Sequence, residues 1–273
     1  MKTHLAFILF ILAVFTLLSF LVLGEEGDRA QRVIASGEVS LTVVYDNYSV
    51  DSDLQTSWGF GCVVKTEKTM VLFDTGGDGS ILLSNMKKVG RVPGDVDVVA
   101  ISHVHGDHVG GLAGFLEENN QVTVYIPASL PDSTREMIGR KGARYVDITE
   151  SRRIVDDVHT AGELGTWIKE QSLIVESTHG LIIVTGCAHP GVVNIVKKAK
   201  AYREEEVHLV MGGFHLMGTP EGELLGIVDE FRKMNVNKVA PSHCSGDLCR
   251  ELFEEEYGED FIDSGVGRTI LID

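Results

Sequence analysis

The stretch ISHVHGDHVGGL, residues 101–112, places three histidines and one aspartate within six positions, from His103 to His108. Side chains two positions apart in an extended chain point the same way, so His103, His105 and Asp107 can converge. The nearby glycines allow a turn that brings His108 toward them. Neighbouring imidazoles repel one another when protonated, but they suit a divalent cation. The stretch therefore predicts a metal-binding loop, and an exposed polar loop with incidental histidines is the alternative.

Further histidines follow other predicted strands in the same manner. The run DVDVVAIS (95–102) is a buried strand that leads into the cluster, and three more strands end just before histidines: LIIVTG (181–186) before His189, VHLVMGG (207–213) before His215 and NKVAP (237–241) before His243. Ligands of open sheets gather at strand ends. We therefore expect these side chains to share one edge of a sheet.

The rest of the chain alternates strand-like and helix-like runs. Strands are predicted over 39–46, 61–66, 70–76, 122–128 and 267–273, and a hairpin over 172–177 and 181–186. Helices are predicted after Ser80 as a cap with Gly90 as the stop, over 192–203, after Thr219 and Pro220, and through Leu248 to Phe253. This mixture favours a layered α/β protein.

The composition and net charge of the chain limit the classes of molecule that it can bind. The chain has 273 residues, of which 44% are hydrophobic and 23% charged, as in ordinary globular proteins. Its formal net charge of −16 disfavours nucleic acid as a partner. We expect a small-molecule substrate. The four cysteines are irregularly spaced and imply no disulfide framework. The sequence leaves the oligomeric state open.

The N-terminus differs from everything after it. Residues 5–23 carry no charge, Lys2 precedes them, and acidic residues follow from Glu25. A run of this length can span a bilayer with its basic end inside. We predict that residues 1–24 are a signal peptide or a membrane anchor and that 25–36 are a linker. The domain at 37–273 would then lie outside the cytoplasm, exported or attached to the membrane through residues 5–23.

Residues 103–108, HVHGDH, resemble the HxHxDH signature of the metallo-β-lactamase fold, and LFDTG (72–76) resembles its upstream aspartate motif. The resemblance covers residues 37–273 and implies an α/β protein built as a four-layer αββα sandwich with a metal site along one edge. A branch of dihydropterin-ribofuranosylaminobenzene phosphate synthase-like metallohydrolases is similar at Asp46-Asn47, at Asn85 and in three blocks: TGCAHPG (185–191), GGFHL (212–216) and HCSG (243–246).

The resemblance implies one or two divalent metal ions, zinc in the first place, with manganese or iron as alternatives. His103, His105 and His189 would hold the first ion, and His159 and His179 compete with His189 for the third position. Asp107, His108 and His243 would hold the second ion. No bridging aspartate is evident, and Cys187 stands where it is expected; a thiolate can ligate zinc. Asp74 is expected to orient the histidine loop through hydrogen bonds.

The implied activity is a metal-dependent hydrolase that uses a metal-bound hydroxide on an ester, thioester or phosphoester. Asp107 would position the hydroxide and carry a proton, and His215 would contact the substrate, unless His215 is a core histidine. The alternatives are a transferase that condenses a pterin with an aminobenzene ribofuranosyl phosphate and a non-catalytic metal-binding protein. Loops near 47–60, 130–170 and 214–222 are expected to set selectivity. The sequence contains no GxSxG motif and no Walker-type loop.

Overall fold

The computed structural model describes residues 37–273, which form two β-sheets packed face to face between helices. The first sheet has seven strands in the order β13-β1-β2-β3-β4-β5-β6, and the second has six in the order β12-β11-β10-β9-β8-β7. The bounds in the first sheet are β1 Val39–Tyr45, β2 Gly61–Lys65, β3 Met70–Phe73, β4 Val98–Ala100, β5 Thr123–Pro127, β6 Arg144–Ile148 and β13 Thr269–Ile272. Those in the second sheet are β7 Arg152–Val155, β8 Val158–Thr160, β9 Leu173–Ser177, β10 Gly180–Thr185, β11 Val207–Gly213 and β12 Lys238–Ser242.

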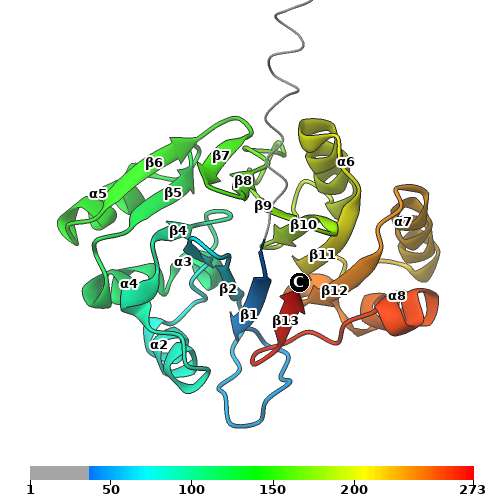
Figure 1. Cartoon of the computed structure of the whole chain (residues 1–273), viewed down its shortest axis with the longest axis horizontal. Coiled ribbons are helices and arrows are strands. Elements are labelled where there is room, and N and C mark those ends of the chain that lie inside the picture. The colour runs from blue at the N-terminus through cyan, green and yellow to red at the C-terminus, as the bar shows by residue number, and fades with distance from the viewer. Residues whose placement is uncertain (1–36) are drawn as a thin grey trace, which may run out of the picture. The chain divides into compact units, whose positions relative to one another are not determined.

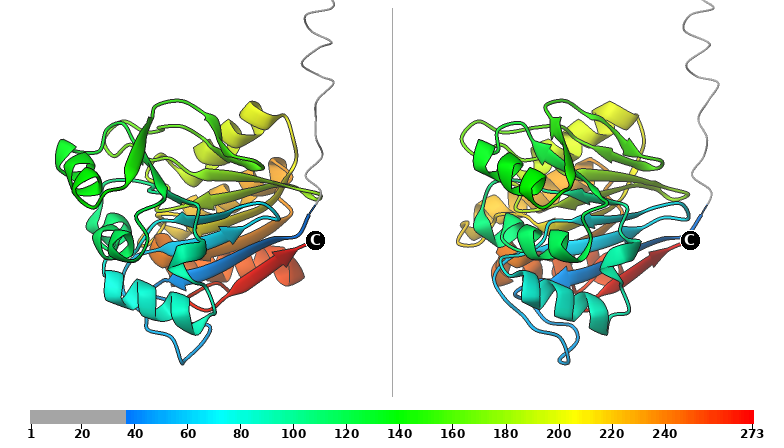
Figure 2. Two further views of the ribbon diagram at one scale, coloured as in Figure 1. Left: turned by 60° about the vertical axis from the view of Figure 1, so that its left-hand side comes forward. Right: turned by 90° about the vertical axis from the view of Figure 1, so that its left-hand side faces the viewer.

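Helices cover the outer face of each sheet. The helices are α2 (Gly79–Lys88), α3 (Gly106–Val109), α4 (Leu112–Glu118), α5 (Asp132–Arg140), α6 (Val192–Arg203), α7 (Glu221–Lys233) and α8 (Asp247–Tyr257), with short 3₁₀ turns at Pro93–Asp95, His243–Ser245 and Gly258–Asp260. Figure 1 shows α2, α4 and α5 on one side of the sandwich and α6, α7 and α8 on the other, and Figure 2 shows the sheets stacked between them. The arrangement is the αββα sandwich that the resemblance implied.

Side chains along each strand point alternately to the two faces of the sheet, which explains how the layers pack. In β2, Cys62 and Val64 point into the core between the two sheets, whereas Val63 faces the helices. In β10, Ile182 and Val184 enter the same central core, whereas Ile183 packs against the helical layer of its own sheet. A strand covered on both faces needs apolar residues at every position, which is why these strands read as unbroken hydrophobic runs. Burial of both faces therefore follows directly from the sequence pattern.

The directions of the strands determine which residues meet at one edge of the sandwich. Strands β3 and β4 are parallel, as are β10, β11 and β12. Strand β9 is antiparallel to β10, so the residues that precede β9 lie at the same edge as those that follow β10. This edge carries all the predicted site residues.

Most of the predicted elements are present, with boundaries within a few residues, but two predictions were wrong. Asp78, not Ser80, caps α2, because its Oδ1 accepts hydrogen bonds from the backbone N–H groups of Ser80 (2.7 Å) and Ile81 (3.2 Å). The region 130–170, expected to be loops, contains α5, β6, β7 and β8. Three of the five residues of β6 are exposed, so the strand lacks the apolar pattern that marks buried strands.

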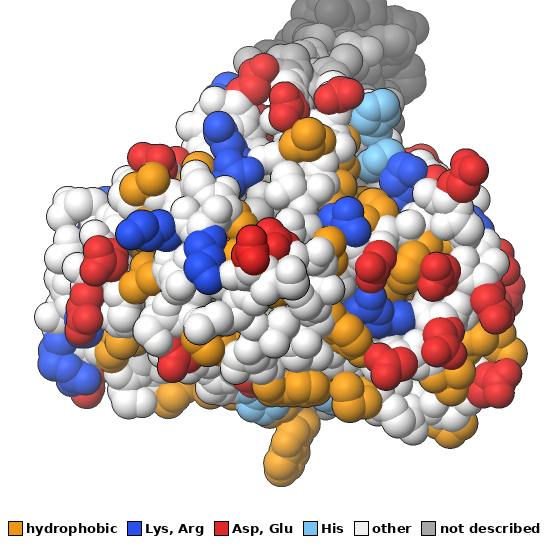
Figure 3. Space-filling view, turned by 90° about the horizontal axis from the view of Figure 1, so that it is seen from below, with side chains coloured by type: hydrophobic (Ala, Val, Ile, Leu, Met, Phe, Trp, Pro, Cys, Tyr) orange, Lys and Arg blue, Asp and Glu red, His pale blue; other side chains and the backbone are white. Residues whose placement is uncertain are grey.

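The predicted leader and linker, residues 1–36, lie outside the described part of the chain. Within residues 37–273, no helix is long and apolar enough to cross a membrane. Acidic and basic side chains are interspersed on the face in Figure 3, and histidine side chains reach its surface beside hydrophobic ones at one edge.

Asn85 ties helix α2 to β1 and to the chain that follows it. Its side-chain amide donates to the carbonyl oxygens of Val44 (3.0 Å) and Gln55 (2.8 Å), and its Oδ1 accepts from the Gln55 N–H (2.9 Å). Asn85 is fully buried, so Asn85→Ala leaves these groups without partners, and we expect the free energy of unfolding to fall by about 1–3 kcal/mol. Urea denaturation followed by circular dichroism measures this. Lys87→Ala, an exposed change on the same helix, is the control; equal stability of both variants would contradict the assignment.

Candidate metal centre

The histidine loop changes conformation in its middle. After β4 the chain bends at Val104 and is extended at His105, which precedes the helical turn α3. The turn carries Asp107 and His108 back toward the end of β3, where the Thr75 N–H donates to the His108 carbonyl oxygen (2.8 Å). His103 and His108 are buried, and His105 and Asp107 are partly exposed. The local helix therefore turns His108 toward the other side chains of the loop.

Two neighbouring groups of potential ligands form at the edge. His103, His105 and His189 make the first, and the second comprises Asp107, His108, Cys187 and His243. In each group, the nearest donor atoms all lie within 4.8 Å of one another. The structure thus brings together all six residues predicted as metal ligands. It places Cys187 with the second group.

Each of four imidazoles is held on its outer side through Nδ1. Its partner is Ser102 Oγ for His103 (2.8 Å), Asp74 Oδ2 for His108 (2.7 Å), Glu170 Oε2 for His189 (2.8 Å) and Asn47 Oδ1 for His243 (2.8 Å). Metal-binding histidines commonly use their second nitrogen in this way, which fixes the ring and leaves Nε2 free. The tautomers follow from this hydrogen-bond network.

The free nitrogens converge inward. His103 Nε2 lies 3.1 Å from His105 Nδ1, and His108 Nε2 lies 3.2 Å from Cys187 Sγ. His243 Nε2 lies 3.3 Å from Asp107 Oδ2, yet it is buried and forms no hydrogen bond. Ligands about 2.0–2.3 Å from a tetrahedral zinc ion lie roughly 3.3–3.8 Å apart. The donor set and its spacing therefore fit two divalent cations.

Glu170, which sequence analysis missed, is the hub of the first group. Its carboxylate accepts hydrogen bonds from the backbone N–H groups of Cys187 (2.9 Å), Ala188 (2.8 Å) and His189 (3.0 Å), besides Nδ1 of His189. Burial opposes ionisation of Glu170, but these hydrogen bonds and the nearby His103 outweigh burial and lower its pKa to about 2. In the sequence Glu170 is one acidic residue before a strand, so nothing local marks it.

Asp74 plays the corresponding part for the second group. It accepts hydrogen bonds from the Ser102 N–H (2.6 Å), from Ser102 Oγ (2.6 Å) and from His108 Nδ1. The space is so tight that a Cβ at Gly186 would lie 2.2 Å from Ser102 Oγ, so this position requires glycine. The structure thus places Asp74 in the orienting position that the resemblance implied.

The backbone at this edge is strained. Four non-glycine residues that directly follow strands or lie within a few residues of them adopt left-handed conformations: Asp74 (φ 58°), Ala188 (64°), His215 (55°) and His243 (49°). Such conformations cost free energy and persist only where the surrounding contacts enforce them, most often at functional sites. The concentration of strain here supports a functional role for the edge.

The two ligand groups differ in how their surroundings shift the pKa values of their side chains. Burial, reinforced by the neighbouring histidines, lowers the pKa of His103 to about 2, so its imidazole is neutral and able to bind a cation. Burial also opposes the protonation of His108, but the carboxylates of Asp74 and Asp107 outweigh it and raise its pKa to about 10. Despite its partial burial, Asp107 has a pKa below its usual range because His108 and His243 face it. The carboxylates around the second group thus stabilise a positive charge among its ligands.

The remaining histidines separate into two kinds. His215 lies beside the centre: its ring centroid is 4.4 Å from that of His189, and it is exposed, not a core residue. Its ring nitrogen also lies within 4.8 Å of the sulfurs of Cys187 and Cys244, which are free thiols. His159 instead pairs with Glu176 (2.8 Å), and His179 stacks on His208. His189, not these competitors, joins His103 and His105.

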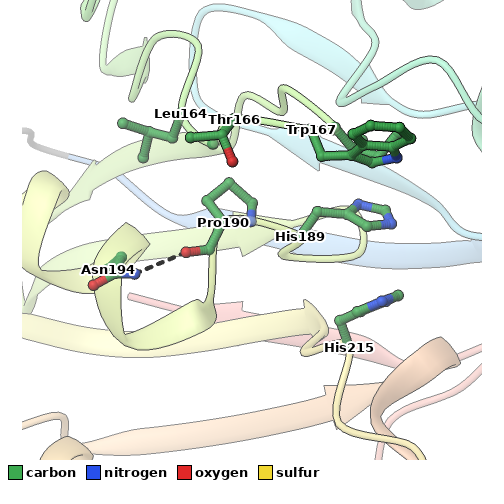
Figure 4. Close-up of a pocket in the computed structure, with 9 residues that line it drawn as sticks. Leu164, Thr166, Trp167, His189, Pro190, Asn194 and His215 are labelled. Carbon is green, nitrogen blue, oxygen red and sulfur yellow. Dashed lines mark hydrogen bonds between the residues drawn. The ribbon is translucent and has the colours of Figure 1, made fainter.

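A cavity of about 480 Å³ opens beside His189 and His215. In Figure 4 the side chains of Trp167, His189 and His215 stand one above another at one end of the cavity, with Leu164, Thr166, Pro190 and Asn194 toward the other. The other tryptophan, Trp58, is half exposed, and its ring centroid lies 4.8 Å from that of His243. The centre is therefore accessible to a small molecule.

Known proteins resemble this chain at the levels of sequence and structure. It is 27% identical to 7,8-dihydropterin-6-methyl-4-(β-D-ribofuranosyl)-aminobenzene-5′-phosphate synthase of Methanocaldococcus jannaschii, over 84% of this chain and 95% of that protein. The crystal structure of a metal-dependent hydrolase of the β-lactamase superfamily superposes with a TM-score of 0.70 at 25% identity, over 85% of this chain and 98% of that one. The short form of human tRNase Z shares the fold, with a TM-score of 0.59 at 17% identity over 85% and 98% of the two chains.

The metallo-β-lactamase superfamily pattern matches residues 62–231, more than half of the chain. The match includes the histidine loop, Glu170 and His189, and the superposed structures share the two-sheet sandwich. The chain belongs to the metallo-β-lactamase superfamily.

Proposed function

We propose that the protein is a metal-dependent hydrolase of a small-molecule ester, thioester or phosphoester. The observation that carries this proposal is the pair of adjacent ligand groups, in which outer hydrogen bonds fix four imidazoles and leave their inner nitrogens free. Membership of the superfamily and the likeness to a metal-dependent hydrolase support it.

The two ligand groups suit zinc best. Imidazole nitrogens and a thiolate are typical zinc ligands, although histidine and carboxylate also accept manganese or iron. His103, His105 and His189 would hold one ion, and Asp107, His108 and His243, together with Cys187, the other. A divalent ion held here lowers the pKa of a bound water to about 7 and polarises a carbonyl or phosphoryl oxygen.

The chain's own residues supply orientation and proton transfer. Asp107 is partly exposed at the open side of the second group, where its carboxylate can accept a hydrogen bond from the attacking water and align it. His215 stands at the cavity wall beside His189, where its imidazole can donate a hydrogen bond to the substrate or a proton to the leaving oxygen. Asp107 and His215 are thus the catalytic residues of the proposal.

The synthase relative supports a second candidate, a transferase that joins a pterin to an aminobenzene ribofuranosyl phosphate. One observation and one further proposal favour hydrolysis. No lysine or arginine lines the cavity, so the phosphate of a ribofuranosyl phosphate, if it lay there away from the metal ligands, would find no fixed cationic side chain. Export through the hydrophobic run at 5–23, which we also propose, would separate the protein from cytoplasmic pterins. A product assay with both transferase substrates distinguishes the candidates.

Metal content is the first test. We expect purified wild-type protein to bind up to two divalent ions, chiefly zinc, and its ester or phosphoester turnover to stop on chelation. His243→Ala should lose one ion, because His243 belongs to only one ligand group. Elemental analysis by mass spectrometry measures the stoichiometry.

His159→Ala is the matched control, since it removes another buried histidine that belongs to neither ligand group. Equal ion loss in both variants would contradict the site. Chelator-insensitive turnover, or protein that binds no metal, would contradict the hydrolase. Metal binding without turnover on any ester, with Asp107→Asn causing no further change, would favour the non-catalytic alternative.

Glu170→Gln tests the orienting carboxylate. The amide keeps the size of the side chain but cannot accept all four hydrogen bonds, so we expect the affinity for the first ion to fall about 10- to 100-fold. Competition with a chromophoric chelator measures this affinity. Glu163→Gln changes a carboxylate on the same segment that contacts Ser129 and Lys169, and it should leave the affinity unchanged. Unchanged affinity in Glu170→Gln would remove Glu170 from the site.

A further inference from the structure

The cavity beside the metal centre has a roof made by residues 164–170. Leu164 and Glu170 exchange backbone hydrogen bonds in both directions, each 2.9 Å, which closes the segment into a loop. Gly165 has φ of 96°, and a Cβ there would lie 2.6 Å from the Ile168 carbonyl oxygen, so the loop requires glycine. Trp167 is at the tip and Glu170, which orients His189, is at the base. The loop therefore joins the cavity wall directly to a ligand-orienting residue.

The exposure of Trp167 is unusual. Its side chain is 93% exposed although it is the largest apolar group on this wall. Leaving an indole in water is unfavourable, and covering it with another apolar surface is favourable. Figure 4 shows Trp167 above His189 at the end of the cavity nearest the metal ligands. A planar group bound there would cover the indole while its reacting bond stayed beside His189 and His215.

The walls of the cavity are uncharged apart from its two histidines. Leu164, Ile168, Pro190 and Trp167 contribute apolar surface, and Thr166 and Asn194 contribute neutral polar groups. The Asn194 amide already donates to the Pro190 carbonyl oxygen (2.8 Å). An anion entering the cavity would lose its hydration and meet no lysine or arginine among the lining residues, whereas a neutral ring would not pay this penalty.

We propose that this cavity binds an uncharged aromatic acyl group of the substrate and that Trp167 is the residue that selects it. The acyl ring lies against Trp167 and Pro190, and the adjoining ester bond faces His189 and His215. This inference rests on the proposed hydrolase for its reaction, but the binding of the group can be measured without turnover.

Three methyl esters with the same leaving group provide the kinetic test: methyl phenylacetate, methyl acetate and monomethyl succinate, followed by acid release on a pH-stat. We expect wild-type kcat/KM for the phenylacetate to exceed that for the anionic succinate by about tenfold or more. Trp167→Ala should lower the phenylacetate value about tenfold and leave methyl acetate unchanged, whereas Trp167→Phe should stay within about threefold of wild type.

Leu271→Ala is the matched control. Leu271 is another exposed apolar side chain, 61% exposed, on β13, where it pairs with Ser40 near the start of β1 and so lies at the edge opposite the metal centre. It should leave all three esters unaffected. An equal fall for methyl acetate and methyl phenylacetate in Trp167→Ala would show that the tryptophan only maintains the loop, and a preference for the succinate would overturn the neutral pocket.

A binding measurement separates this inference from the proposed function. N-methylphenylacetamide carries the same acyl group on an amide, and ligand-observed NMR reports its binding without hydrolysis; N-methylacetamide is the comparison. Binding of the aromatic amide to wild type but not to Trp167→Ala, with no ester turned over, would refute the hydrolase and support the pocket. Ester turnover that is the same in wild type and in Trp167→Ala would support the hydrolase and refute the pocket. Self-association of wild type that Trp167→Ala abolishes, measured by sedimentation velocity, would identify the tryptophan as a contact between copies and overturn the proposal.

Discussion

Two buried carboxylates, Asp74 and Glu170, hold the metal centre in its shape. A buried carboxylate is costly unless its oxygens are hydrogen-bonded, and each of these accepts bonds from a histidine ring and from at least one backbone N–H group. Because these carboxylates hold the Nδ1 atoms of His108 and His189, the two rings are fixed and their Nε2 atoms point inward. Asp74 follows β3 in one sheet, and Glu170 precedes β9 in the other. The centre therefore exists only when the two sheets have packed together.

The packing of the sheets is itself reinforced at this edge. The Gln171 side chain donates to the carbonyl oxygens of Ile101 (2.8 Å) and Tyr125 (3.1 Å) across the sandwich, and its backbone N–H donates to Ser102 (2.9 Å). Gln171 is next to Glu170, so the segment that orients the first ligand group also anchors the second sheet to the histidine loop. Stability and metal binding thus depend on the same few residues, and the strained backbone at Asp74 and His243 is tolerated because these contacts enforce it.

The ligand groups at the sheet edge and the cavity beside them have different roles in the proposed site. The candidate ligands follow strand ends, whereas the cavity that we propose binds the substrate is lined by the loop at 164–170 and by the start of α6. Known proteins similar to this chain include a synthase and a metal-dependent hydrolase. The residues that line the cavity beside His189 and His215 are apolar or neutral, and Trp58 lies beside His243.

The histidine loop, the buried strands and the edge at which their carboxyl ends meet could be predicted from the amino-acid sequence, because residue type and the spacing of apolar positions are local properties of the chain. It was sufficient to predict the superfamily, which is confirmed, and the six ligand candidates, which the fold brings together. It did not show the exposed strand β6 or Asp78 as the cap of α2. Other features became apparent only in the folded chain: Glu170 meets His189, Cys187 joins the second group, His159 and His179 lie elsewhere, and Trp167 is exposed to solvent. These depend on contacts between residues distant in sequence, and no local pattern encodes which buried carboxylate will face which imidazole.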